Sequence, residues 1–320
     1  MKNWIKTRDK NTLSLFLLAL VIFIVMGILS PKQFLGITNL QGMCIQFPEY
    51  GIMAIGMTIC MMAGGIDLSL VGIANLSGIL ATVCMTSISG TSGIAVGMIT
   101  ALITGIVCGM INSFFIGVLK IPPMLVTLCG LQLYTGIGLA ITKGPALTGL
   151  PDGISMIANG TIAGIPIVLI IFIAVAAVMS YILNQTVYGR ELCYYGCNDK
   201  ASRYSGINNL KVIFKTYMLS GLLGSICGII MISHYNSAKS DYGNTYTLLT
   251  LLIAVLGGTS PDGGKGKVSG VVMAILVLQI VSSSFNILRV NSYIKTFVWG
   301  LILIVVMVAG YLLRRRRETA

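Results

Sequence analysis

The chain has 320 residues, of which 56% are hydrophobic and 9% are charged, and its formal net charge is +12. With a mean hydropathy of +0.92, this composition excludes a soluble domain and indicates membrane-spanning segments. The basic residues stand at the ends of apolar segments rather than on one continuous face. The positive charge therefore indicates membrane topology and argues against nucleic-acid binding.

About ten apolar segments follow one another along the chain. They lack strict alternation of polar and apolar positions, which predicts helices and excludes the strands of a membrane barrel. We therefore expect an all-α, polytopic integral membrane protein with a single transmembrane domain over residues 1–320. The eighth segment is too short to cross a bilayer as one straight helix. The segments are approximately 12–30, 43–62, 70–88, 93–118, 121–142, 162–184, 212–233, 246–258, 268–285 and 293–313.

Basic residues predict the orientation of these segments. With a cytoplasmic N-terminus, most of the 21 Lys and Arg residues fall on the inner side of the membrane. Both termini and the long polar interval Gly189–Lys215 are then cytoplasmic. The closing run Arg314–Arg317 is expected to anchor the last segment by meeting anionic lipid.

Glycines four residues apart recur inside the apolar segments. Such small-xxx-small pairs let the backbones of neighbouring helices approach closely. They predict tight packing within one bundle, and a dimer seam is an alternative. The pairs are Gly93/Gly97, Gly105/Gly109 and Gly224/Gly228.

Paired glycines next to acidic or hydroxyl residues interrupt the apolar pattern twice, at residues 63–69 and at residues 256–266. Irregular backbone at membrane depth persists only where protein or water covers it, and a carboxylate there needs a partner or a wet cavity. The two breaks therefore predict a translocation path or its gate. For Asp67 the alternative is that it only caps the helix that begins near Ser69.

Small hydroxyl and amide side chains in these segments suit a path for a solute that needs many neutral hydrogen bonds. Each of them could instead bond one helix to another. The candidates for the translocation path are Gly64, Gly65, Asp67, Ser69, Asn75, Ser77, Asn112, Thr127, Gly257, Gly258 and Asn286.

The second break resembles a phosphate-binding loop but lacks its key residues. Gly266 follows Gly264-Lys265 where the loop needs a Ser or Thr to bind magnesium, and Thr259 stands at the first glycine position. The chain also has a single histidine, no metal-ligand cluster and no nucleophile–base pair. We expect a chain that is not an enzyme and binds no cofactor or metal itself, so any ATP must be hydrolysed by a different subunit.

The interval Gly189–Lys215 predicts a short helix with a signal at each end. Asn198 can accept hydrogen bonds from the free N–H groups of the first turn, and Asp199 places a negative charge at the positive end of the helix dipole. Gly206 can end the helix in the left-handed conformation. We expect an exposed, rigid helix of about two turns inside a cytoplasmic loop of approximately residues 186–211.

Four stretches make the chain resemble the membrane permease subunits of ABC sugar importers of the ribose, xylose and galactose type. GGIDLS at Gly64–Ser69 and VLGGTSPDGGKGKVSG at Val255–Gly270 are the most specific. KIPPMLVTLCG at Lys120–Gly130 is similar to the family's PPFIVTLG motif, with Met124 in place of the usual Phe. GRELCYYGCNDKASRYSGIN at Gly189–Asn208 is similar to the family's cytoplasmic loop. The resemblance covers nearly the whole chain in order.

The resemblance implies partners and a cellular location, the cytoplasmic (inner) membrane of a bacterium. In such importers a cytoplasmic coupling helix docks into a groove of an ATPase subunit, which holds ATP-Mg. An extracytoplasmic sugar-binding protein delivers the solute, and a second permease copy or paralogue completes the transmembrane part. The alternative is that the loop is only a charged topological anchor. The residues expected to contact the ATPase are Asn198, Asp199, Ala201, Ser202, Arg203 and Gly206.

Departures from the family pattern leave the solute open. Thr247 and Leu249 stand where the family often has Glu and Asp, and Gly196-Cys197 replaces its usual glycine pair. We expect a monosaccharide or sugar-like solute, with autoinducer-2 or a nucleoside as alternatives. The lost acids are also compatible with a heterodimer whose other half retains them. An ion-coupled secondary carrier is a rival, but Glu49 and Asp67 are the only acids expected within the membrane, which is thin support for a proton relay.

Overall fold

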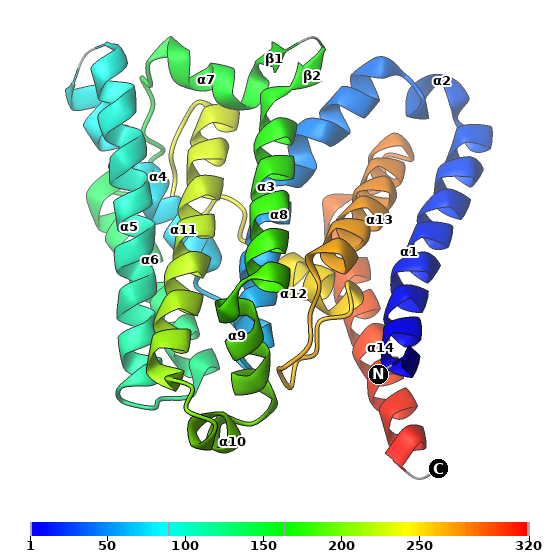
Figure 1. Ribbon diagram of the computed structural model, residues 1–320. Helices are drawn as coiled ribbons and strands as arrows, with labels where there is room; N and C mark the ends of the chain where they lie inside the picture. The colour runs from blue at the N-terminus through cyan, green and yellow to red at the C-terminus, as the bar shows by residue number, and fades with distance from the viewer. Residues whose placement is uncertain (1, 89, 163, 319–320) are drawn as a thin grey trace.

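The computed structural model describes residues 2–88, 90–162 and 164–318 as a bundle of helices (Figure 1). Each predicted apolar segment corresponds to one helix, although the sixth begins as a helix at Ile167 and not at residue 162, and this confirms the all-α class. These helices are α1 (Lys2–Leu29), α3 (Ile37–Met62), α4 (Leu70–Ser87), α5 (Thr91–Gly117), α6 (Pro123–Thr142), α8 (Ile167–Gln185), α11 (Asn209–Tyr235), α12 (Tyr246–Leu256), α13 (Val268–Ile287) and α14 (Ser292–Glu318).

Short elements mark the two ends of the bundle. One end carries α2 (Pro31–Phe34), α7 (Asp152–Asn159) and a small hairpin of β1 (Thr161–Ile162) and β2 (Ile165–Pro166), in which Thr161 pairs with Pro166. The opposite end, which we call the α10 end, carries α9 (Val187–Cys197) and α10 (Asp199–Tyr204). Helix α1 begins and α14 ends at the α10 end as well (Figure 1).

Within the residues that the structure describes, eight helices are long and apolar enough to cross a membrane, and Tyr246–Leu256 and Tyr293–Val308 are shorter apolar helices. Helix α12 has 11 residues. At 1.5 Å per residue it spans about 16 Å, roughly half of a bilayer's hydrocarbon core. This confirms that the eighth segment is too short to cross alone, and α12 packs against α3, α13 and α14. A total of ten crossings remains a prediction.

Helices α3 and α11 form the centre of the bundle. In each of them 78% of the most apolar window is buried, against 17% in α1 and 22% in α8. A helix that is apolar all round and mostly exposed suits a lipid-facing position, whereas α3 and α11 are covered by other helices. The two central helices also contact each other, and α4 and α5 pack onto α11.

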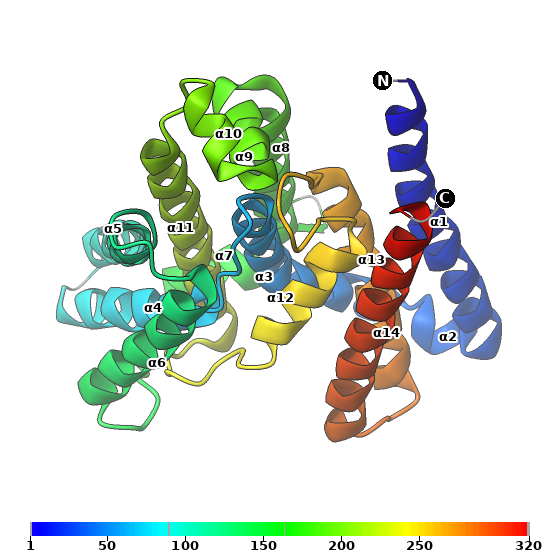
Figure 2. The ribbon, with the colours of Figure 1, turned by 90° about the horizontal axis from the view of Figure 1, so that it is seen from below.

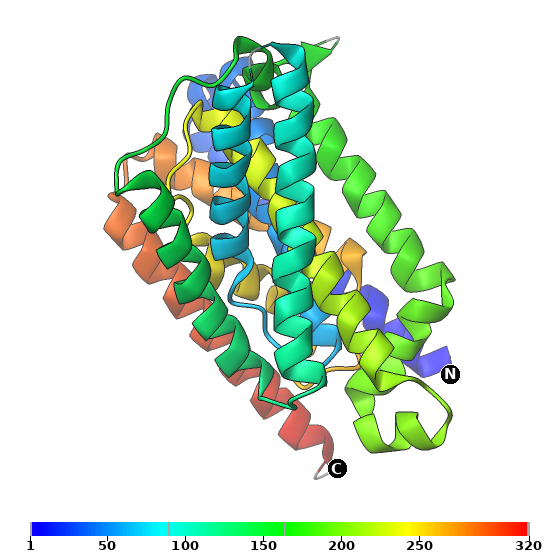
Figure 3. The ribbon, with the colours of Figure 1, turned by 90° about the vertical axis from the view of Figure 1, so that its left-hand side faces the viewer.

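Glycines allow α5 and α11 to cross at close range (Figure 3). A Cβ atom added at Gly105 would lie 2.3 Å from the carbonyl oxygen of Gly221, and one at Gly109 would lie 2.3 Å from that of Tyr217. A Cβ at Gly228 would lie 2.3 Å from the carbonyl oxygen of Ala74 in α4. The predicted tight packing within one bundle is confirmed at these positions.

We expect Gly105→Ala to lower the thermal stability of the purified protein. The added methyl group overpacks the α5–α11 contact against main-chain atoms, which costs about 1–3 kcal/mol. Gly136→Ala in α6 is the control, because nothing lies within 4 Å of its added Cβ and the gain in helix propensity is the same. Equal melting temperatures of the two variants in detergent would contradict the close crossing.

Candidate functional site

The helix predicted between Asn198 and Gly206 is present as the six-residue α10. The Asn198 Oδ1 accepts from the backbone N–H groups of Lys200 and Ala201, both at 3.0 Å. At the other end Gly206 has φ +82°, its N–H donates to Arg203 O at 3.1 Å, and Ile207 N–H donates to Ser202 O at 3.1 Å. This is the double hydrogen bond of a Schellman motif, so both predicted caps are confirmed.

Side-chain bonds fasten α10 to the start of α11. The Ser202 hydroxyl donates to Asn209 Oδ1 at 2.9 Å, and the Asn209 amide donates to the carbonyl oxygen of Asp199 at 2.7 Å. Ser202 is only 3% exposed, whereas Tyr204 is 94% exposed. Ser202 was expected to contact a partner, but its side chain faces inward and holds the helix in place. The other predicted contact residues are exposed: Asn198, Asp199, Ala201, Arg203 and Gly206.

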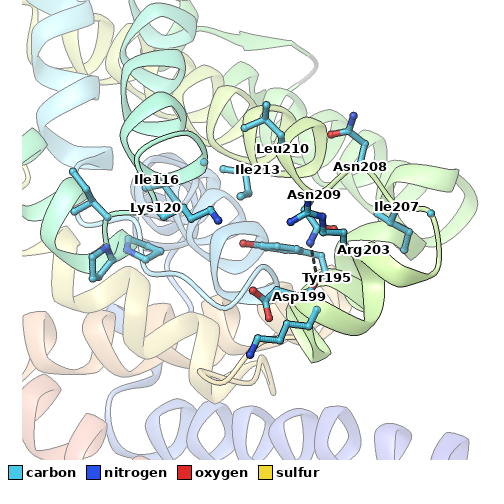
Figure 4. Close-up of a pocket in the computed structure, with 16 residues that line it drawn as sticks. Ile116, Lys120, Tyr195, Asp199, Arg203, Ile207, Asn208, Asn209, Leu210 and Ile213 are labelled. Atoms are coloured by element: carbon cyan, nitrogen blue, oxygen red, sulfur yellow. Dashed lines mark hydrogen bonds between the residues drawn. The ribbon is translucent and has the colours of Figure 1, made fainter.

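Hollows lie on two sides of α10. A cavity of about 830 Å³ separates α10 from the turn between α5 and α6, and a second of about 580 Å³ lies between α9 and α10. In the first, Lys120 reaches in from the α5–α6 turn and faces Tyr195, with Asp199 and Arg203 across from it (Figure 4). Burial and the Asp199 charge raise the pKa of the Tyr195 phenol above its ordinary value.

Asp67 in the first break is fully buried and hydrogen-bonded on both carboxylate oxygens. Its Oδ1 accepts from the Ser69 hydroxyl at 2.6 Å and from the Ser69 N–H at 3.1 Å, and its Oδ2 accepts from the Ser220 hydroxyl of α11 at 2.6 Å. Ser69 is the residue before α4, and no described side chain accepts from the free N–H groups of that helix's first turn, so Asp67 fixes the turn ahead of α4 and does not cap it. These neutral donors offset part of the cost of burying the carboxylate.

The same network extends to α5 and α6. The Asn112 amide donates to the Ser69 hydroxyl at 2.8 Å and its oxygen accepts from the Tyr134 hydroxyl at 2.9 Å. The Thr127 hydroxyl donates to the carbonyl oxygen of Ile66 at 2.8 Å. Four of the predicted path residues, Asp67, Ser69, Asn112 and Thr127, therefore belong to one buried cluster that joins the first break to three helices. Ser220 and Tyr134, which complete it, were not predicted.

Other predicted path residues lie elsewhere. The Asn75 amide donates to the carbonyl oxygens of Ser240 and Tyr242, both at 2.9 Å, and so holds the loop after α11. The Ser77 hydroxyl bonds within its own helix to Ala74 O at 2.9 Å. Asn286 is exposed near the end of α13 and accepts a hydrogen bond from Lys295. The structure does not gather these residues around the Asp67 cluster, and whether any of them meets a solute stays a prediction.

Glycines of both breaks adopt left-handed backbone or leave no space for a side chain. Gly64 has φ +80° and Gly258 has φ +86°, conformations that side-chain-bearing residues rarely adopt. A Cβ at Gly257 would lie 2.8 Å from the Val271 Cα of α13, and one at Gly65 would lie 2.4 Å from the Tyr217 hydroxyl. The Gly264 N–H donates to the carbonyl oxygen of Met62 at 2.8 Å, which joins the second break to the end of α3, directly before the first break. Each break was predicted from its paired glycines, but the close approach of the two segments was not.

A second buried acid lies toward the end of the bundle opposite α10. The Glu49 carboxylate, on a residue only 1% exposed, accepts from Tyr246 at 3.0 Å and Tyr235 at 3.3 Å and pairs with His234. The cluster joins α3, the end of α11 and the start of α12. Sequence reasoning noted Glu49 and the single histidine separately, and nothing in their spacing pointed to the pair.

Most of the chain matches the sequence model of one protein family. Residues 39–307 match the family described as "Branched-chain amino acid transport system / permease component". No solved structure gives a significant match.

Several curated proteins are similar over nearly the whole chain. The ribose import permease protein RbsC of Bacillus subtilis (strain 168) is 33% identical, over 91% of this chain and 89% of the relative. The L-arabinose transport system permease protein AraH of Escherichia coli (strain K12) is 29% identical, over 93% and 90%. The autoinducer 2 import system permease protein LsrD of Enterobacter sp. (strain 638) is 31% identical, over 99% and 95%.

We expect Ser220→Ala to destabilise the protein by about 1–3 kcal/mol, because Asp67 loses a donor in a buried site. Ser87→Ala is the matched control, since the Ser87 hydroxyl is exposed and bonds only to its own helix. The measurement is the melting temperature of both variants in the same detergent. If the melting temperature of Ser220→Ala equals that of the Ser87→Ala control, the bond from Ser220 to Asp67 contributes nothing to stability.

Proposed function

The chain belongs to the family described as branched-chain amino acid transport system / permease component, and we propose that it is the permease subunit of an ATP-binding-cassette importer. It spans the inner membrane of a bacterium and gives a monosaccharide or sugar-like solute an alternating-access path. One structural observation carries the mode of action: a short helix, capped at both ends and fastened to α11, stands exposed at one end of the bundle. The chain itself is not an enzyme.

The proposed class of solute is inferred from the names of the similar curated proteins. The family description names amino acids, whereas the similar curated proteins are named for import of ribose, L-arabinose and autoinducer 2. A pentose or related sugar is therefore the first candidate. Autoinducer 2 is the second, because the permease named for it aligns with 99% of this chain.

Helix α10 is the proposed contact with the ATPase subunit, which holds ATP-Mg. The hollows on two sides of the helix let a partner's groove close around it. Lys200 and Arg203 are exposed on it and favour an acidic partner surface by speeding and orienting the encounter. Asn209 and Ser202 keep the helix from rotating independently of α11, so a push on α10 is passed into the bundle.

The α10 end is the proposed cytoplasmic side. Lys120, Lys200 and Arg203 gather around one cavity there, and Lys265 lies in the second break, which reaches toward the same end beside α9 (Figure 1). Cytoplasmic loops are enriched in Lys and Arg. The extracytoplasmic sugar-binding protein then docks at the opposite end, on α7 and the loop between α11 and α12.

A second permease copy or paralogue is proposed to complete the path. Helices α6, α12 and α14 lie in succession along one edge of the bundle, with the short α12 between the two longer ones (Figure 2). A helix of half-membrane length needs protein or water at its end, because lipid cannot satisfy its free backbone groups. The exposed Gly258 at the end of α12 suits the wall of such a path, whereas the buried Asp67 cluster suits its support.

We expect the double variant Asn198→Ala and Arg203→Ala to insert into the membrane normally. Its solute uptake should fall by about tenfold or more, which lies within the range that a typical coupling free energy produces. The variant loses the cap of α10, which costs about 1 kcal/mol of helix stability, and one exposed charge. Solute uptake and copurification with the ATPase are measured in membranes that contain the whole importer.

The matched control removes an amide and a base at the opposite end of the bundle, with Lys32→Ala and Gln33→Ala at two exposed positions of α2. It should leave uptake and copurification unchanged. The docking role of α10 is refuted if the Asn198/Arg203 variant behaves like this control.

A further inference from the structure

Main-chain atoms from three distant segments meet at one point near the α10 end. They are the end of α9 at Gly196, the end of α3 at Met62, and the second break at Gly264. The Gly264 N–H donates to the carbonyl oxygen of Met62 at 2.8 Å. A Cβ added at Gly196 would lie 1.9 Å from that same oxygen and 2.5 Å from the Gly264 nitrogen. Figure 1 shows the second break reaching down beside α9. We call this contact the glycine junction.

The junction is equally tight on its other side. A Cβ added at Gly263 would lie 2.4 Å from the carbonyl oxygen of Gly196 and 3.0 Å from the Cα of Gly64. Gly263 also has φ +90°, which disfavours any other residue there. The neighbours are backbone atoms, so no flexible side chain can yield. Packed backbones of this kind transmit displacement because they have no room to slip.

Both helix breaks and α10 are tied to this junction. Only Asn198 separates the end of α9 from the start of α10, and its side chain caps α10. From the junction, the first break leads to Asp67 and through Ser220 to α11. The second break leads back to Gly257, whose added Cβ would lie 2.8 Å from Val271 of α13.

We propose that Gly196 and Gly263 are positioning residues for transport, which pass a displacement of α10 to both broken segments at once. The inference rests on the proposed function, because it requires an ATPase that moves α10. Beyond the proposed function, it names the glycine junction as the place where movement of α10 is passed to the first break and to the second break. Neither residue touches the solute in this account, and each acts through the breaks it holds.

The first test uses Gly196→Ala in the complete importer, reconstituted with its ATPase and binding protein. The added methyl group must push the end of α9 away from Met62 and Gly264. We expect ATP hydrolysis to continue while uptake falls by about tenfold or more, so that more ATP is consumed for each solute imported. Gly136→Ala, whose added Cβ meets nothing within 4 Å, should keep the wild-type ratio.

Other outcomes of this test overturn the inference. One such outcome is that Gly196→Ala imports solute at the wild-type rate, and another is that its uptake and its ATP hydrolysis fall in parallel. Either result would show that the junction does not pass movement of α10 to the broken segments. Absence of ATP-dependent uptake by the wild-type importer would overturn the proposed function itself and the inference with it.

A second measurement needs no change in the junction and remains decisive if Gly196→Ala fails to assemble. Spin labels are placed by bio-orthogonal chemistry at Tyr204 in α10, at Lys265 in the second break and at Met156 in α7, all of which are exposed. Between the nucleotide-free and vanadate-trapped importer, we expect the Tyr204–Met156 distance to change and the Tyr204–Lys265 distance to stay the same. A changed Tyr204–Lys265 distance, or no change in either, would contradict the inference.

Discussion

Direct contact between backbones is the constraint on which this structure depends. Where α5 crosses α11 and where α9 meets both helix breaks, the space for a Cβ atom is already filled by carbonyl oxygens and amide nitrogens. In lipid, helices gain little from burying apolar side chains against each other, so close packing and polar contacts carry more of the association. Glycine residues allow the close helix crossings in this chain, and paired glycines form the two breaks at residues 63–69 and 256–266.

Buried polar side chains hold those interruptions in place. The Asp67 carboxylate is satisfied by serine hydroxyls and a backbone N–H, and the cluster around it reaches α5, α6 and α11. At the other end, Glu49 joins α3, α11 and α12 through His234 and two tyrosines. The Asp67 cluster fixes irregular backbone that could not otherwise persist at membrane depth, whereas the Glu49 cluster ties together residues that lie within helices.

Local signals in the sequence predicted local structure well. The caps of α10 follow from Asn198 and Gly206, the short α12 follows from the length of its apolar run, and the close helix crossings follow from glycine spacing. Contacts between distant segments could not be predicted, because no periodicity links Ser220 to Asp67 or Gly196 to Gly264. The inward turn of Ser202 was missed for a similar reason: it depends on Asn209, which belongs to the next helix.

In the proposed division of roles, this chain forms the path while a separate ATPase supplies the energy through α10. Its most direct test is solute accumulation in vesicles that hold the purified chain, its ATPase and its binding protein, with nucleotide on the α10 side. We expect uptake of labelled ribose or a related sugar with ATP, and none with a non-hydrolysable analogue or with the chain alone. Uptake by the chain alone, or uptake that is indifferent to nucleotide, would contradict it.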